Sequence, residues 1–281
     1  MLPNDVADNY RTYAFRQFKK ELTHLSRLHW IFQFGVRSVC QSLDVGNVSN
    51  GDHLTTMLPV SGFESKRLNI SAGEFRNGSD RYIEHLRVLL LVKACANMEG
   101  YIHRIAHIWA ARNGYFDGKA ASGIDVRGRA LIKPAMVSNL KGSLEYLQTL
   151  LGGNFGADLA VCTEAYQLRC IAAHNGGVVD RESAKAFPQF GSVIGEPVRL
   201  GWSELKQYLR AISAVSNEIE RAIPSRHRVH GEVALIATEL VKFREIQPDD
   251  VDGVREILKS RMKFHRLPGR SFIAGVMGTK R

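Results

Sequence analysis

Arg169 and His174 lie five positions apart near the end of an apolar segment, and together their side chains could cleave RNA without a metal ion. The 2′-hydroxyl of RNA is its own nucleophile, so the protein has only to move protons and to neutralise the charge that develops on the phosphate. The negative end of a helix dipole favours the charged form of a histidine, which suits a general acid. An arginine offers a permanently charged fork to the phosphate oxygens.

The spacing of this pair is not specific by itself, because a shuffled chain of the same composition would contain a few such pairs. Arg221 and His227 form the other pair of this kind, but Pro224 lies between them and would break the helix that has to hold them. The first pair instead closes an apolar segment that is followed at once by Asn175-Gly176-Gly177, a turn signal.

Five positions along a helix turn the side chains of Arg169 and His174 about 140° apart, so they do not share one stripe. Either the long arginine side chain wraps round the helix end, or two chains contribute to one site. The alternative without chemistry is that Arg169 lies on the surface and His174 only caps its helix.

Apolar side chains recur every three or four residues along most of the chain, which is the pattern of amphipathic helices. We expect helices over residues 8–43, 81–112, 133–151, 157–174, 202–223, 232–246 and 249–264. Residues 44–80 are rich in Gly, Ser and Asn and predict a loop-rich insertion with one or two short strands. Residues 187–200 have the pattern of a small β-hairpin. The predicted fold class is all-α, with this hairpin following the helix that carries Arg169 and His174.

These features resemble the HEPN superfamily, the higher eukaryotes and prokaryotes nucleotide-binding helical bundles. Members carry Arg, four to six residues and then His, often followed by Asn-Gly-Gly and an acidic residue, as in 169–180 here. Members similar to this chain also have an earlier core helix with a Glu after small apolar residues, as in 94–99, and a hairpin and final helix after the motif. Cys170 departs from the family, because many catalytic members have a polar residue there.

The resemblance implies a metal-independent endoribonuclease without a cofactor, in which Arg169 and His174 of two chains face each other in a homodimer cleft. The products would carry a 2′,3′-cyclic phosphate. In this setting Glu99 would orient Arg169, and Asn175 would contact phosphate; otherwise Glu99 is an ordinary carboxylate and Asn175 only tolerates the turn. The family further implies a toxin or antiviral defence effector of a prokaryote, with RNA, a second copy, and an antitoxin or other regulatory protein as partners.

Glu99, His103 and His107 lie four residues apart on one face of the predicted helix 81–112 and could ligate a metal. Three ligands on one straight helix rarely converge on one ion, and Arg104 stands where a zinc protease has its catalytic Glu. We therefore expect no metal site and interpret the three residues as a polar stripe.

The formal charge of +10 is concentrated at the C-terminal end. Residues 257–281 contain no acid and seven basic residues: Lys259, Arg261, Lys263, Arg266, Arg270, Lys280 and Arg281. Phe264 and Phe272 are interleaved with them, a mixture that suits a strand of RNA, and the first five basic residues are our candidates for RNA binding. A second cluster, 226–230, follows Pro224. The alternative is a charged, solvated tail, although its apolar residues imply that it docks on the protein.

The composition of the 281 residues, 44% hydrophobic and 23% charged, is that of a globular protein. The longest aliphatic run, 88–92, is too short to span a membrane, and the N-terminus lacks the order of a secretory signal, so we expect a cytoplasmic protein without membrane contact. The four cysteines form no C-x-x-C pair. We expect a helical bundle over 1–223 and a basic helical extension over 224–281. The rivals to a ribonuclease are a non-catalytic module that binds RNA, a nucleotide or a partner protein, and a purely structural protein.

Overall fold

The computed structural model describes residues 11–56, 69–112, 140–152, 154–156, 158–174, 177–265 and 267–277. In this part of the chain the regular structure is helical, and β-pairing is limited to two isolated bridges, His53 with Ser71 and Val178 with Pro197. The predicted all-α class is confirmed. The helices are α2 (Tyr13–Val45), η1 (Leu54–Thr56), α4 (Ala72–Arg112), α6 (Leu140–Leu151), α7 (Asp158–His174), α8 (Arg181–Ala186), η2 (Pro188–Val193), α9 (Trp202–Ala222), α10 (Ser225–Lys242), α11 (Val251–Ser260) and α12 (Arg270–Val276).

The chain forms two compact units. The terminal unit comprises Met1–Glu21, Cys95–Glu164 and Arg210–Arg281, and the inner unit comprises Leu22–Ala94 and Ala165–Leu209. Helices α2, α4, α7 and α9 each contribute residues to both units. The predicted boundary at residue 223 falls inside the terminal unit, and the division into a bundle and a basic C-terminal extension stays a prediction.

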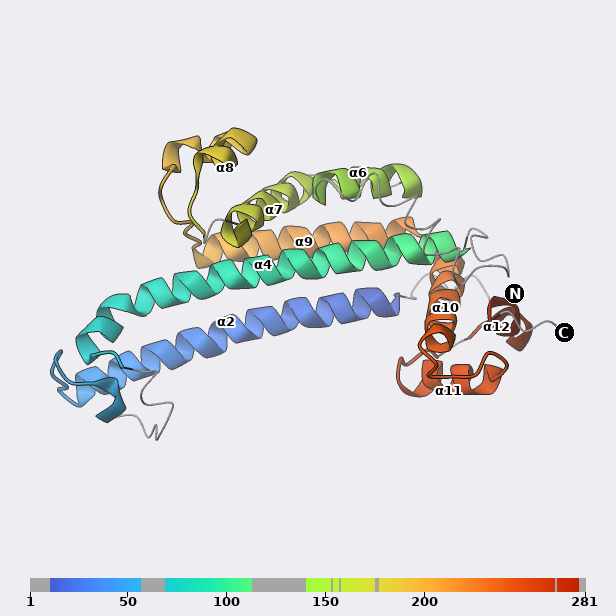
Figure 1. The fold of residues 1–281 in the computed structure, drawn as a ribbon, viewed down its shortest axis with the longest axis horizontal. Helices are drawn as coiled ribbons and strands as arrows, with labels where there is room; N and C mark the ends of the chain where they lie inside the picture. The colour runs from blue at the N-terminus through green and yellow to red at the C-terminus, as the bar shows by residue number, and fades with distance from the viewer. Residues whose placement is uncertain are drawn as a thin grey trace. The chain divides into compact units, whose positions relative to one another are not determined.

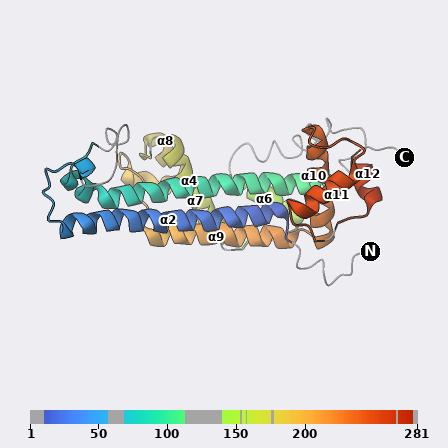
Figure 2. The ribbon, with the colours of Figure 1, turned by 90° about the horizontal axis from the view of Figure 1, so that it is seen from below.

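In the terminal unit, α10, α11 and α12 enclose a common core. Figures 1 and 2 show α12 beside α10 and α11 in both views. The buried core residues are Val233, Ile236, Ala237, Leu240, Val254, Leu258, Phe264, Ile273 and Met277. Ile273 is fully buried, and burial of one such side chain contributes about 1.5–3 kcal/mol. The inference that the tail docks on the protein is thereby confirmed for α12.

The first turn of α2 is held by two buried carboxylates. Glu232 of α10 accepts hydrogen bonds from the N–H groups of Tyr13 (2.7 Å) and Ala14 (3.0 Å), and Glu220 of α9 accepts one from the N–H of Thr12 (2.5 Å). These N–H groups have no partner within their own helix, and negative charge is favourable at this end. The carboxylates therefore fix where α2 starts.

Helix α4 begins earlier than the sequence predicts, which corrects part of the predicted insertion 44–80. Its start is a capping box: Ser71 Oγ accepts a hydrogen bond from the N–H of Glu74 (3.2 Å), and the Glu74 carboxylate accepts one from the N–H of Ser71 (2.7 Å). The segment 77–80, Asn-Gly-Ser-Asp, is consequently helical. The cost of a helical glycine, about 1 kcal/mol, is outweighed by this cap and by packing of the helix.

The predicted hairpin over 187–200 is wrong. Residues 181–193 form α8 and η2 instead, and the described part of the segment pairs only through the bridge of Val178 with Pro197. Asp180 caps α8 by accepting a hydrogen bond from the N–H of Ser183 (2.7 Å). Of the apolar residues that suggested strands, Val193 and Val198 pack in a cluster with Ile171, Val179, Ala184, Phe187 and Phe190, whereas Ile194 is exposed. Alternation of apolar residues over so short a stretch does not separate a strand from two helical turns.

Candidate functional site

Helix α7 carries the predicted catalytic pair near its C-terminal end, as the sequence predicts. Arg169 is half-buried, and its guanidinium carbon lies 5.4 Å from the centre of the Tyr166 ring, one turn earlier on the same helix. Leu168 and Ile171 on either side of it are buried. The contact with Tyr166 is a cation–π interaction that limits the directions in which the arginine can point.

His174 is the last residue of α7. Its side chain, together with Asn175 and Gly176, falls outside the described residues, so the predicted phosphate contact of Asn175 stays a prediction. Gly177 follows with a φ of +82°, a left-handed conformation that favours glycine. The helix therefore ends at the histidine, in the place that the sequence predicts.

The chain after this turn is fastened to the segment that leads into α9. The N–H of Val198 donates a hydrogen bond to the carbonyl of Gly177 (2.6 Å), and the N–H of Val179 donates one to the carbonyl of Glu196 (3.0 Å). Ile171 of α7 and Val179 are buried in the same cluster as residues of α8 and η2. These bonds place residues 197–199 next to the end of the motif.

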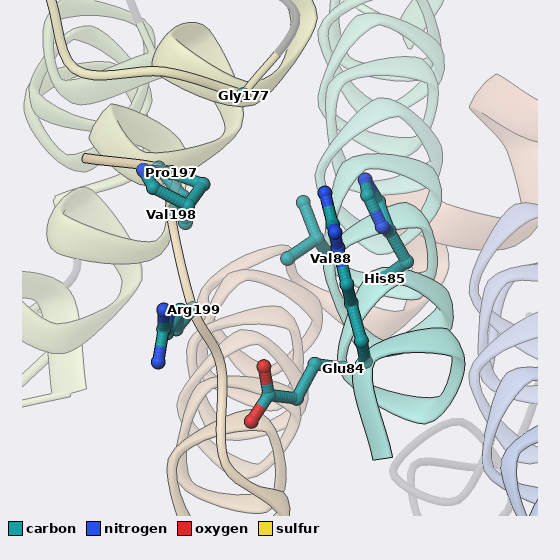
Figure 3. Close-up of a pocket in the computed structure, with 8 residues that line it drawn as sticks. Glu84, His85, Val88, Gly177, Pro197, Val198 and Arg199 are labelled. Carbon is teal, nitrogen blue, oxygen red and sulfur yellow. The ribbon is translucent and has the colours of Figure 1, made fainter. Parts of the chain in front are cut away.

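A pocket with a volume of about 300 Å³ lies at this junction. Figure 3 shows Glu84, His85 and Val88 of α4 along one wall, and the segment that carries Arg199 along the facing wall, with the Glu84 carboxylate extended toward it. The lining residues, all in the inner unit, are Arg81, Glu84, His85, Val88, Gly177, Pro197, Val198 and Arg199.

The pocket was missed at the sequence level, although part of its signal is visible there. Arg81, Glu84, His85 and Val88 follow the spacing of one helix face, i, i+3, i+4 and i+7. Because the sequence predicts a helix that begins at Arg81, this pattern falls on its first turns and indicates no more than a helix start. Arg199 comes from a distant part of the chain, and no local pattern connects it with α4.

Cys170 is half-buried in α7, between the two residues of the motif. Cys162, two turns earlier and in the terminal unit, is buried, and burial and then the charge of Asp158 raise the pKa of its thiol to about 12. Cys162 is thus an unreactive part of the core.

Glu99 lies on α4 in the terminal unit, whereas Arg169 belongs to the inner unit. The predicted orienting contact between them stays a prediction. Arg104, on the same helix, forms an ion pair with Glu239 of α10. Among the described residues no group of three or more His, Cys, Asp and Glu side chains is arranged to hold a metal ion.

The basic residues of the C-terminal end divide into paired and unpaired groups. Arg270 forms an ion pair with Asp252, and Arg261 lies 3.8 Å from the Glu245 carboxylate. Lys259 and Lys263 are exposed and form no ion pair with a described residue. Arg266, Lys280 and Arg281 lie outside the described residues.

The cluster 226–230, predicted to follow Pro224 before the next helix, is helical, because α10 already begins at Ser225. Arg228 is buried, with 4% of its surface exposed, and the His230 ring meets the Phe272 ring edge-on at 4.9 Å. Both side chains therefore face the protein rather than a ligand in solvent.

Comparison of the chain with protein-family models, with curated proteins and with solved structures finds no match. Among the described helices, none is both long and apolar enough to cross a membrane.

Proposed function

We propose that this protein is a metal-independent endoribonuclease of the HEPN type, with Arg169 and His174 of two chains at a dimer cleft. The observation that carries the proposal is the placement of both residues in the last two turns of α7, which ends three residues before Gly177, a lining residue of the pocket that contains Arg81 and Arg199. The HEPN resemblance of the sequence, which includes this pair, also supports it.

The chemistry assigned to the pair follows from its groups. The 2′-oxygen attacks the phosphorus, the bond to the 5′-oxygen breaks, and a 2′,3′-cyclic phosphate and a 5′-hydroxyl result. A charged His174 donates the proton that the departing 5′-oxygen needs, and in a dimer the uncharged imidazole of the other copy accepts the proton of the 2′-hydroxyl. Arg169 neutralises the charge that develops on the phosphate oxygens.

The biological setting that we propose is a toxin or antiviral defence effector in the cytoplasm of a prokaryote, held in check by an antitoxin or another regulatory protein. An enzyme that cuts RNA without a metal ion or cofactor is active wherever RNA is present, so such a cell needs a partner that blocks or releases it.

The test is incubation of the purified protein with mixed RNA in excess EDTA. We expect the wild type to cut and His174→Ala to be inactive while its circular dichroism spectrum is unchanged. His24→Ala is the matched control, because His24 is an exposed histidine on a different helix, α2. Cleavage by His174→Ala at the wild-type rate would refute the assignment.

The second candidate function is a non-catalytic module that binds RNA, a nucleotide or a partner protein. Cys170 within the motif favours it, since many catalytic HEPN members have a polar residue there, and the pocket could bind phosphate without chemistry. This candidate predicts that the wild type leaves RNA intact but retards it in a gel, and that Arg169 and His174 substitutions do not change the affinity.

A further inference from the structure

The pocket between α4 and residues 197–199 has no role in the proton transfers assigned to His174. Its charged side chains are two guanidiniums, Arg81 and Arg199, and one carboxylate, Glu84. Both arginines are exposed, and neither forms an ion pair with a described residue. Two guanidiniums against one carboxylate leave the pocket with a net positive charge, which favours an anionic ligand.

The rest of the lining limits what that anion can be. Val88 is buried and Val198 half-buried, so the pocket has an apolar side beside its charged one. A volume of about 300 Å³ is at the lower end for small-molecule pockets. A ligand with one phosphate and one flat apolar ring meets both conditions, whereas a bare inorganic ion would leave the apolar side unused.

Glu84 adds a preference among such ligands. An ionised carboxylate only accepts hydrogen bonds. Cytosine, adenine and guanine each present an amino group that can donate to it, but uracil has a carbonyl oxygen where cytosine has its amino group. The carboxylate of Glu84 would therefore attract cytosine and repel uracil in the same orientation.

We infer that this pocket is a subsite for one nucleotide of single-stranded RNA with an amino-bearing base, where Arg81 and Arg199 bind the phosphate and Glu84 selects the base. The inference rests on the proposed function, because it assigns the pocket to the same RNA strand. Gly177 is three residues from His174, and three residues span at most about 11 Å. One strand can thus reach both places with neighbouring nucleotides.

The experiment measures binding of cytidine and uridine monophosphates to the full chain by calorimetry, in the His174→Ala background. These two ligands differ in one exocyclic group. We expect cytidine monophosphate to bind roughly tenfold more tightly than uridine monophosphate. Glu84→Gln should remove this preference, because an amide both donates and accepts. Arg199→Ala and Arg81→Ala should weaken both ligands about equally.

Matched controls are Glu182→Gln and Arg37→Ala, which change exposed residues of the inner unit that do not line the pocket, and neither should change binding. Equal affinity for the two nucleotides, a preference that survives in Glu84→Gln, or inorganic phosphate binding as tightly as cytidine monophosphate would each overturn the inference. Circular dichroism of each variant establishes that it is folded.

The two proposals fail in different ways. RNA cleavage by the wild type without any binding of cytidine monophosphate would leave the ribonuclease and remove the subsite. Binding that follows the pattern above, in a protein that does not cut RNA, would keep the subsite and remove the ribonuclease.

Discussion

The hydroxyl of Tyr101 donates a hydrogen bond to the carboxylate of Glu220 across 3.0 Å, in the buried centre of the terminal unit. The same carboxylate accepts hydrogen bonds from the N–H and the hydroxyl of Thr12. Burial raises the pKa of the Glu220 carboxyl. The N–H of Thr12, the charge of Arg228 and the Tyr101 hydroxyl lower this pKa, but the effect of burial is larger. Burial likewise raises the pKa of Tyr101 well above its ordinary value. This contact joins α4 to α9 and to the start of α2.

The raised pKa of Glu220 predicts a pH-dependent stability. A group whose pKa is higher in the folded than in the unfolded protein binds its proton more tightly when folded. Its contribution is complete below the ordinary value of 4.5 and is lost as the pH rises through the raised value. Relative to Glu220→Gln, the wild type should therefore lose free energy of unfolding as the pH is raised from 4.5 toward neutrality. Urea denaturation of both proteins across this range measures it, and a constant difference would contradict it.

His29 predicts the opposite dependence in the inner unit. Its ring is buried and stacks on Trp202, with centroids 4.2 Å apart and an angle of 6°, and burial and then the charge of Arg87 lower its pKa. The unfolded chain binds this proton more readily, so stability is lost as the pH falls below the ordinary value of 6.5. His29→Phe keeps a stacked ring without titration. We expect its melting temperature to fall less than that of the wild type between pH 7.5 and 5.5; parallel curves would exclude the effect.

Gly231 should not tolerate a side chain. An added Cβ would lie 2.3 Å from the backbone oxygen of Ile108, where α10 packs on α4. Because the contacted atom belongs to the backbone and not to a flexible side chain, Gly231→Ala should lower the free energy of unfolding by about 1–3 kcal/mol. Gly100→Ala is the matched control, since a Cβ there meets nothing within 4 Å, and it should be neutral or stabilising by up to about 1 kcal/mol. Similar stabilities of the two variants would show that the backbones of α4 and α10 can separate at Gly231 without loss of stability.

Arg169→Lys tests the role of the guanidinium. A lysine keeps the charge but cannot bind phosphate with two parallel hydrogen bonds, so we expect RNA cleavage in EDTA to fall by roughly tenfold or more. The matched control is Arg37→Lys, at an exposed position of α2. A variant with wild-type activity would mean that Arg169 contributes only charge or only packing on Tyr166.

The exposed lysines at the C-terminal end test the predicted RNA contact there. Lys259 and Lys263 form no ion pair with a described residue, whereas Arg261 and Arg270 lie near acids. If the two lysines each neutralise one phosphate, the double change to Gln should reduce the slope of log affinity against log salt by about 1.4. Gel shifts at several salt concentrations measure it, with Lys20→Gln as the control. An unchanged slope would favour a tail that is only solvated.

Helical periodicity was sufficient to predict the elements that bury a continuous apolar face. The helix over 157–174 is observed as Asp158–His174, and that over 202–223 as Trp202–Ala222. Both combine a regular apolar face with a sharp end, at a glycine turn and at Pro224. Their boundaries are therefore encoded locally.

The errors came from signals that depend on side-chain contacts. Gly78 is typical of a turn, yet the cap formed by Ser71 and Glu74 starts the helix before this glycine, and the helix continues past it. In the same way, sequence alone predicts an exposed carboxylate at Glu232 of α10. Its burial depends on the N–H groups of Tyr13 and Ala14, which lie 219 and 218 positions away in the sequence. The pair Arg169 and His174 could be proposed from spacing and context, but the pocket beside it depends on Arg199 and α4 meeting in space.

The hydrogen bonds between residues 177–179 and 195–198 join the segment that carries Arg199 to the chain that follows α7. Gly177 lies three residues after His174, and Val198 precedes Arg199 by one residue. If a ligand draws Arg199 into the pocket, we expect the displacement to reach the end of α7 through these hydrogen bonds. We therefore expect occupancy of the pocket and the position of the end of α7 to depend on each other.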